Sequence, residues 1–188
     1  MSEIENIQKE FDFSQHRLKA VAEYQKVKDL YGEFAQVVKN ILSESLNESN
    51  ISVHSIESRA KDLNSFGKKA STRSLDNPNK PKYTNPIVEI TDLAGLRVIT
   101  FFPKTQEFVS NSILSQFEVI EISDKSEILI KEEKFGYASI HYLIRLKNDR
   151  TKLLEYKRFR NLIAEIQVRT ILQHAWAEIE HDIQYKSI

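Results

Sequence analysis

Residues 92–102 read Asp-Leu-Ala-Gly-Leu-Arg-Val-Ile-Thr-Phe-Phe, and this stretch decides the fold class. The apolar run from Arg97 to Phe102 predicts a strand, and apolar residues at helical spacing over 104–117 predict a helix directly after it. Outward from this pair, the same reading predicts three more strands and a closing helix. They cover residues 118–122, 137–146, 162–169 and 171–184. This mixture of strands and helices predicts an α+β or α/β domain.

The first 48 residues predict a long amphipathic helix, because apolar residues from Leu18 to Leu46 recur at three- and four-residue steps. We therefore divide the chain into a helical segment, 1–48, and a domain, 49–188. Before the stretch quoted above, a short strand that includes Ile51 and Val53 is expected within residues 49–58, and a second helix over 59–72. Residues 74–86 hold three of the four prolines and predict a loop.

The composition excludes several classes of protein. Hydrophobic residues make up 40% of the 188, and 27 basic residues balance 27 acidic ones, which does not indicate a strongly basic nucleic-acid binder. There is no cysteine for disulfides or thiol chemistry, and no apolar run of the roughly 18 residues that a membrane helix needs. A cytoplasmic protein without membrane contact is expected. The four glycines form neither GxGxxG nor a Walker loop, so bound phosphate must be held by side chains.

The charge is distributed unevenly. Residues 59–82 carry seven basic and two acidic side chains, an excess of +5 that the rest of the chain cancels. Such a cluster can hold a polyphosphate, although a solvated helix face would have the same composition.

Two predicted strands each present a polar face. On the strand expected at 137–146, one face carries Tyr137, Ser139 and His141. On the strand expected at 162–169, one face carries Glu165, Gln167 and Arg169. Both rows could simply face solvent. Alternatively, Glu165 and Asp92, which stands at the entrance of the strand quoted first, can share a Mg²⁺ ion. An Asp beside a turn glycine, as Asp92 is, also serves to cap a turn. In the closing helix, Trp176 and Ile179 are expected in the core.

Five segments, in this order, resemble the RelA/SpoT synthetase domain over about residues 50–187. They are Arg59-Ala60-Lys61 with Ser65 and Lys69; Asp92 to Arg97; Gly136 to His141; Glu165 to Thr170; and Trp176 to Lys186. The resemblance implies a nucleotidyltransferase-like mixed β-sheet flanked by helices. It also implies an ATP-dependent pyrophosphokinase that moves the β,γ-pyrophosphate of ATP to the 3′-hydroxyl of GDP or GTP, making (p)ppGpp and releasing AMP.

Site roles follow from the same resemblance, position by position. ATP would be bound by Arg59, Lys61, Ser65, Lys69 and, by a looser match, Arg73. Asp92 would bind Mg²⁺, and Glu165 would complete the metal site or activate the attacking hydroxyl. Tyr137 would stack on the acceptor base. The remaining acceptor contacts would be His141, Gln167, Arg169, His174 and Lys134.

Two alternatives remain open at this point. One is a toxic relative that pyrophosphorylates the 3′ end of tRNA or makes an adenosine alarmone, since Ala138 replaces a longer polar residue of many synthetases. The other is an inactive nucleotide- or RNA-binding module. The N-terminal helix can serve self-association into a homo-oligomer or hold a neutralising antitoxin.

Overall fold

A computed structural model describes residues 11–124 and 139–186, with the backbone alone for 180–186. The described elements, in chain order, are α1 (Phe13–Glu48), β1 (Ser55–Ala60), α2 (Leu63–Ala70), α3 (Pro86–Glu89), β2 (Ala94–Thr100), α4 (Pro103–Gln116), β3 (Phe117–Asp124), β4 (Ile140–Leu146), β5 (Ala164–Thr170) and α6 (Ile171–Lys186). Short 3₁₀ turns, Arg150–Lys152 and Lys157–Phe159, lie between β4 and β5. The long N-terminal helix is confirmed.

The described strands form one mixed sheet in the order β1-β2-β5-β4-β3. Only β2 and β5 run parallel, and every other neighbouring pair is antiparallel. Residue contacts divide the chain into two compact units, Met1–Val27 with Asp62–Ile90 and Lys28–Lys61 with Thr91–Ile188. The whole sheet belongs to the second unit. The division of the chain at residue 48 stays a prediction.

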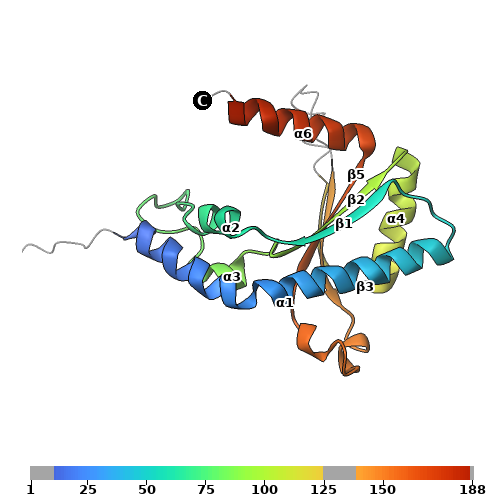
Figure 1. Ribbon diagram of the computed structural model, residues 1–188, viewed down its shortest axis with the longest axis horizontal. Helices are drawn as coiled ribbons and strands as arrows, with labels where there is room; N and C mark the ends of the chain where they lie inside the picture. Colours follow the sequence, from blue (N-terminus) through green and yellow to red (C-terminus); the bar gives the residue numbers. More distant parts are fainter. Residues whose placement is uncertain (1–10, 125–138, 187–188) are drawn as a thin grey trace, which may run out of the picture. The chain divides into compact units, whose positions relative to one another are not determined.

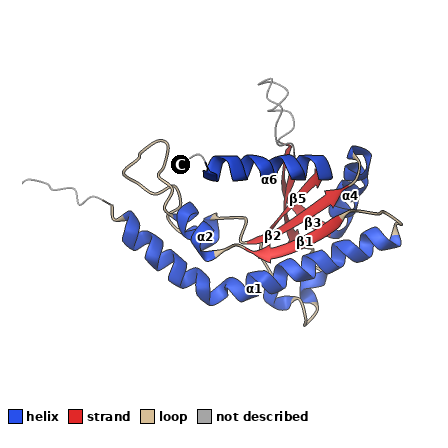
Figure 2. Cartoon of the chain, turned by 45° about the horizontal axis from the view of Figure 1, so that its top comes forward, coloured by secondary structure: helices blue, strands red, loops and turns tan. Residues whose placement is uncertain are grey.

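In the sheet-bearing unit, one face of the sheet is apolar and the opposite face is polar. Buried residues at alternate positions of β2, β5 and β4 pack against α4 and the second half of α1, and Phe34, Leu42 and Ile113 are fully buried there. Helix α6 runs along the opposite side of the sheet from this part of α1 (Figures 1 and 2). The mixed sheet with flanking helices is therefore confirmed, and its polar face lies under α6.

Capping explains where α6 begins. The hydroxyl of Thr170 accepts a hydrogen bond from Gln173 N at 3.2 Å, and the Gln173 side chain accepts one from Thr170 N at 2.7 Å. This reciprocal pair is a capping box, and it supplies two of the partners that a helix start otherwise lacks. Three apolar side chains further along α6, Leu172, Trp176 and Ile179, are 79%, 47% and 54% exposed, so the expectation that Trp176 and Ile179 lie in the core was wrong.

Two expectations before β2 were also wrong. Ile51 and Val53 do not belong to the strand expected within 49–58; β1 begins at Ser55 and, in the sheet of the described residues, pairs with β2 at its edge. The second helix begins at Leu63 rather than at 59, because the Asp62 carboxylate accepts hydrogen bonds from Asn64 N and Ser65 N and so caps it. Arg59 consequently stands on a strand and not on a helix.

The unit formed by the start of α1 and residues 62–90 has its own packing. Tyr24 and Phe66 are fully buried, with ring centroids 4.4 Å apart. Gly67 faces α1 closely: a Cβ there would lie 2.9 Å from both Arg17 Nε and Val21 Cγ2. The glycine in α2 is thus explained by close helix packing rather than by backbone conformation.

Candidate active site

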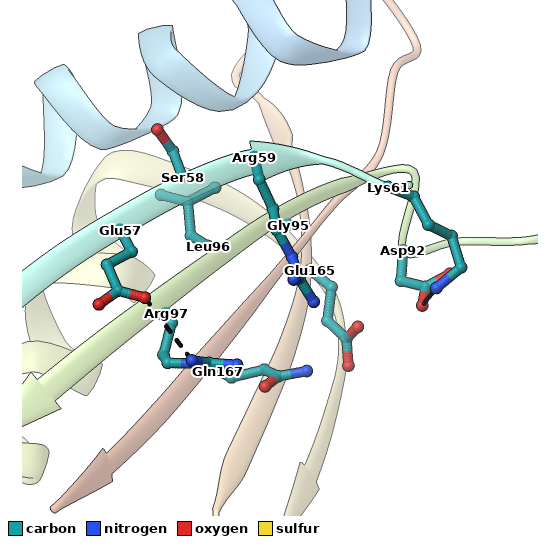
Figure 3. A pocket seen from close by; sticks show the side chains of 10 residues that line it. All are labelled: Glu57, Ser58, Arg59, Lys61, Asp92, Gly95, Leu96, Arg97, Glu165 and Gln167. Atoms are coloured by element: carbon teal, nitrogen blue, oxygen red, sulfur yellow. Dashed lines mark hydrogen bonds and ion pairs between the residues drawn. The ribbon is translucent and has the colours of Figure 1, made fainter. Parts of the chain in front are cut away.

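A hollow of about 180 Å³ opens on the polar face of the sheet (Figure 3). Its walls come from β1, β2, β5 and the residues that join them. They are Glu57, Ser58, Arg59, Lys61, Asp92, Gly95, Leu96, Arg97, Glu165 and Gln167. All ten lie in the sheet-bearing unit. Four of the residues predicted from the sequence to bind ATP or metal, together with Gln167, are therefore brought to one place.

Strand register places Arg59, Gly95 and Glu165 in one row across β1, β2 and β5. Directly paired residues present their side chains on the same face of a sheet. Since Gly95 has no side chain, the space between the outer two residues is open, and the Arg59 side chain extends past Gly95 toward Glu165 (Figure 3). The glycine thus forms the floor of the hollow.

Lys61 and Asp92 form an ion pair at one end of the hollow. The distance from Lys61 Nζ to Asp92 Oδ2 is 2.6 Å, and the two side chains are 17% and 20% exposed. A backbone hydrogen bond from Lys61 N to Leu93 O, 2.9 Å, joins the two segments beside the pair. The pair is largely shielded from water, so its charges interact more strongly than surface charges do.

Glu165 is held from the β4 side. Its Oε1 lies 2.5 Å from His141 Nδ1, and His141 Nε2 lies 2.6 Å from Ser139 Oγ. Although His141 pairs directly with Gln167 in the strand register, its ring reaches the diagonal neighbour Glu165. The carboxylate that lines the hollow therefore has a fixed partner on the adjacent strand.

Arg97 links the hollow to α6. Its Nη1 lies 3.6 Å from Glu57 Oε2 on β1 and 3.4 Å from Glu178 Oε1 on α6. His174, one turn before Glu178, has its Nδ1 3.6 Å from the same Oε1. Burial lowers the pKa of His174, the Arg97 guanidinium lowers it further, and Glu178 opposes both effects. Electrostatics therefore favour a neutral His174 beside a charged Arg97.

A model of the region found in RelA / SpoT proteins matches residues 58–188 of this chain. The chain belongs to the RelA/SpoT family. It is 36% identical over 97 residues to GTP pyrophosphokinase YwaC of Bacillus subtilis, covering 52% of this chain and 43% of that protein. It is 24% identical over 131 residues to GTP pyrophosphokinase YjbM of the same organism, covering 70% and 56%. The chain thus spans about half the length of these curated relatives.

The fold agrees with solved RelA/SpoT-type structures. Small alarmone synthetase 1 from Bacillus subtilis superposes with a TM-score of 0.67 at 23% identity, over 87% of this chain and 80% of that one. The same synthetase has also been solved bound to its product pppGpp. The resemblance and the fold class inferred from the sequence are both confirmed.

The remaining predicted site residues lie in three places. Gln167 and Arg169 are on β5, where Arg169 Nη2 donates to Gln167 Oε1 at 2.5 Å. Ser65, Lys69 and Arg73 belong to the other compact unit, and Arg73 donates to Pro78 O at 2.7 Å. Tyr137 and Lys134 lie outside the described residues.

Two charged residues that line the hollow, Arg97 and Glu57, were given no role from the sequence of this RelA/SpoT chain. Arg97 was detectable, because it stands two residues after Gly95 on the same strand and so must face the same way. Glu57 was missed because the strand was expected around Ile51 and Val53, so the alternation of side chains from Ser55 to Ala60 was not recognised.

Proposed function

We propose that this chain transfers the β,γ-pyrophosphate of ATP to the 3′-hydroxyl of GDP or GTP, forming (p)ppGpp. The strongest support is that one hollow brings together the two cations and the two carboxylates predicted from the sequence to act there: Arg59, Lys61, Asp92 and Glu165. Arg59 and Lys61 can donate hydrogen bonds to phosphate oxygens. Glu165 can act as a base, and Asp92 can bind a metal ion. Two curated relatives are named GTP pyrophosphokinases, which favours guanosine over tRNA as the acceptor.

The transfer requires the protein to align two nucleotides, to neutralise phosphate charge and to accept one proton. A bond forms between the acceptor 3′-oxygen and the β-phosphorus of ATP, the bond from that phosphorus to the α–β bridging oxygen breaks, and AMP leaves with this oxygen. The hydroxyl proton passes to Glu165. Such reactions depend on alignment and on neutralising phosphate charge, rather than on covalent chemistry by the protein. Arg59 and Lys61 supply that charge in a chain that lacks a glycine phosphate loop.

We propose Mg²⁺ as the cofactor, held by Asp92 and Glu165. The two carboxylates fit this ion, because Mg²⁺ takes one or two carboxylates and completes its shell with water and substrate phosphate. Within the described part of the chain, no group of three or more His, Asp or Glu side chains is placed to hold a metal. The two carboxylates, Asp92 and Glu165, suit an ion whose other ligands are nucleotide phosphates and water. When bound, Mg²⁺ withdraws charge from the phosphates that it contacts.

The other predicted roles complete the proposal. Ser65, Lys69 and Arg73 would add contacts to ATP. Tyr137, with Lys134, would bind the acceptor, and Tyr137 would stack on its base, as aromatic rings do with any nucleobase. Gln167, Arg169 and His174 would surround the same nucleotide.

The function is tested by incubating the protein with ATP labelled at its γ-phosphate, Mg²⁺ and, in separate reactions, GDP, GTP, ATP or deacylated tRNA. The expected result is label on GDP and GTP alone. Transfer of label to tRNA alone, or from one ATP to the 3′-hydroxyl of another ATP alone, would overturn the guanosine assignment. No transfer to any acceptor would overturn the assignment of an enzyme. Within residues 11–124 and 139–186, none of the helices combines the length and the apolar character of a membrane span.

A further inference from the structure

Three polar side chains form an unbroken chain of hydrogen bonds from the start of β4 to β5. Ser139 contacts His141 Nε2, and His141 Nδ1 contacts Glu165, at 2.6 and 2.5 Å. Both ring nitrogens of His141 are therefore engaged by groups of the chain itself. Ser139 is 2% and His141 9% exposed, whereas Glu165 lines the hollow.

The connectivity is that of a serine hydrolase triad, in which serine contacts Nε2 and an acid contacts Nδ1. The exposure of the serine and of the acid is the reverse of that in a hydrolase triad. A nucleophile must meet its substrate, and Ser139 is almost fully buried. The group that faces a ligand is the carboxylate at the other end. The arrangement is therefore suited to orienting Glu165 and not to activating Ser139.

We propose that Ser139 and His141 are positioning residues that fix the Glu165 carboxylate for the transfer. A carboxylate only accepts, so the imidazole carries its proton on Nδ1 and donates it to Glu165. The unprotonated Nε2 then accepts from the Ser139 hydroxyl, which locks the tautomer and the plane of the ring. Hydrogen bonds of this second layer commonly hold catalytic and metal-binding groups in place.

This inference rests on the proposed function for its effect on turnover, and it gives His141 a different role from direct contact with the acceptor. A residue that orients Glu165 affects the transition state, and therefore kcat. A residue that touches the acceptor affects its binding, and therefore KM. The two roles are separated by kinetics.

The tautomer is measured first, by nitrogen NMR of the full chain labelled in its five histidines at alkaline pH. The His141 signals are assigned by their loss in His141→Asn. We expect a neutral ring protonated on Nδ1, with an unprotonated Nε2. A ring protonated on Nε2 would overturn the proposal. Because this measurement needs no turnover, it decides the matter even if no acceptor is modified, a result that would refute the proposed function alone.

Three substitutions then test the direction of the effect. Asparagine can place an amide N–H where Nδ1 lies, whereas glutamine places one where Nε2 lies. We expect His141→Gln and His141→Ala to lower kcat by about 10- to 100-fold, with KM for both nucleotides nearly unchanged, and His141→Asn to retain more activity than either. Ser139→Ala should lower kcat by about fivefold, the worth of one net hydrogen bond.

His54→Ala is the matched control, since this exposed histidine contacts Phe101 edge-to-face and lies outside the hollow. Its kinetics should equal those of the wild type. Folding of each variant is checked by its urea midpoint. A raised acceptor KM at unchanged kcat, or equal kcat in His141→Asn and His141→Gln, would contradict a positioning role.

Discussion

Replacing Gly95 by valine should block the hollow without disturbing the fold. The backbone at Gly95 is not left-handed, and a Cβ there meets no atom closer than the Arg59 carbonyl oxygen at 3.8 Å, an ordinary contact. The side chain would stand in the row between Arg59 and Glu165, inside a hollow of about 180 Å³. Crowding a packed site costs about 1–3 kcal/mol, which corresponds to about 5- to 150-fold weaker nucleotide binding.

The assay pairs titration calorimetry of a non-hydrolysable ATP analogue with urea unfolding. Gly32→Ala is the matched control: its Cβ would meet Ala60 Cβ at 3.8 Å, and it lies in α1 away from the hollow. That substitution should raise the free energy of unfolding by up to about 1 kcal/mol and leave binding unchanged. Wild-type affinity in a folded Gly95→Val protein would refute the assignment of the hollow as the ATP site.

Three further predictions concern stability and charge. Gly67→Ala should lower the free energy of unfolding by about 1–3 kcal/mol, measured in urea, because its Cβ would overlap two α1 side chains; an unchanged midpoint would contradict the close packing. In a double-mutant cycle, Lys61→Met and Asp92→Asn should couple by about 1 kcal/mol, and purely additive losses would show that the ion pair contributes nothing. The pKa of His174 is lowered by burial and by Arg97, so the unfolded chain binds this proton more readily and the stability of the protein falls as pH drops below about 6.5. NMR titration should show that the pKa of His174 rises in Arg97→Gln. An unchanged pKa would exclude the coupling between these two residues.

Elements with a strong hydrophobic period were predictable from the sequence. The apolar run of β2, the alternation in β5 and the helical spacing in α1 predicted these elements. β2 and β5 lie within a few residues of their expected bounds, and α1 ends at Glu48 as expected but begins at Phe13 in the described part of the chain. β1 was not predictable in this way. Its sequence, Ser-Ile-Glu-Ser-Arg-Ala, carries only one large apolar side chain, and the strand exists because β2 offers it an edge to pair with.

Many residues of the site were also predictable, because period-two alternation showed which side chains of one strand share a face. The sequence did not predict how the strands pair with one another. The hydrogen bond from His141 to Glu165 joins residues 24 apart in the chain, and it depends on the register of β4 against β5. The ion pair of Arg97 with Glu178 depends likewise on where α6 lies. Such contacts are set by tertiary packing, which no local pattern encodes.

The transfer of pyrophosphate, with Glu165 as the base, is tested by measuring both products of one reaction. Wild-type protein and Glu165→Gln are incubated with ATP, GDP and Mg²⁺, and AMP and the modified guanosine nucleotide are quantified together by mass spectrometry. In the wild type we expect one AMP for each GDP that gains a pyrophosphate at its 3′-hydroxyl. We expect no product from Glu165→Gln, although this variant still binds nucleotide. Unchanged turnover in Glu165→Gln, or AMP released without pyrophosphate on the 3′-oxygen, would contradict the proposed mechanism.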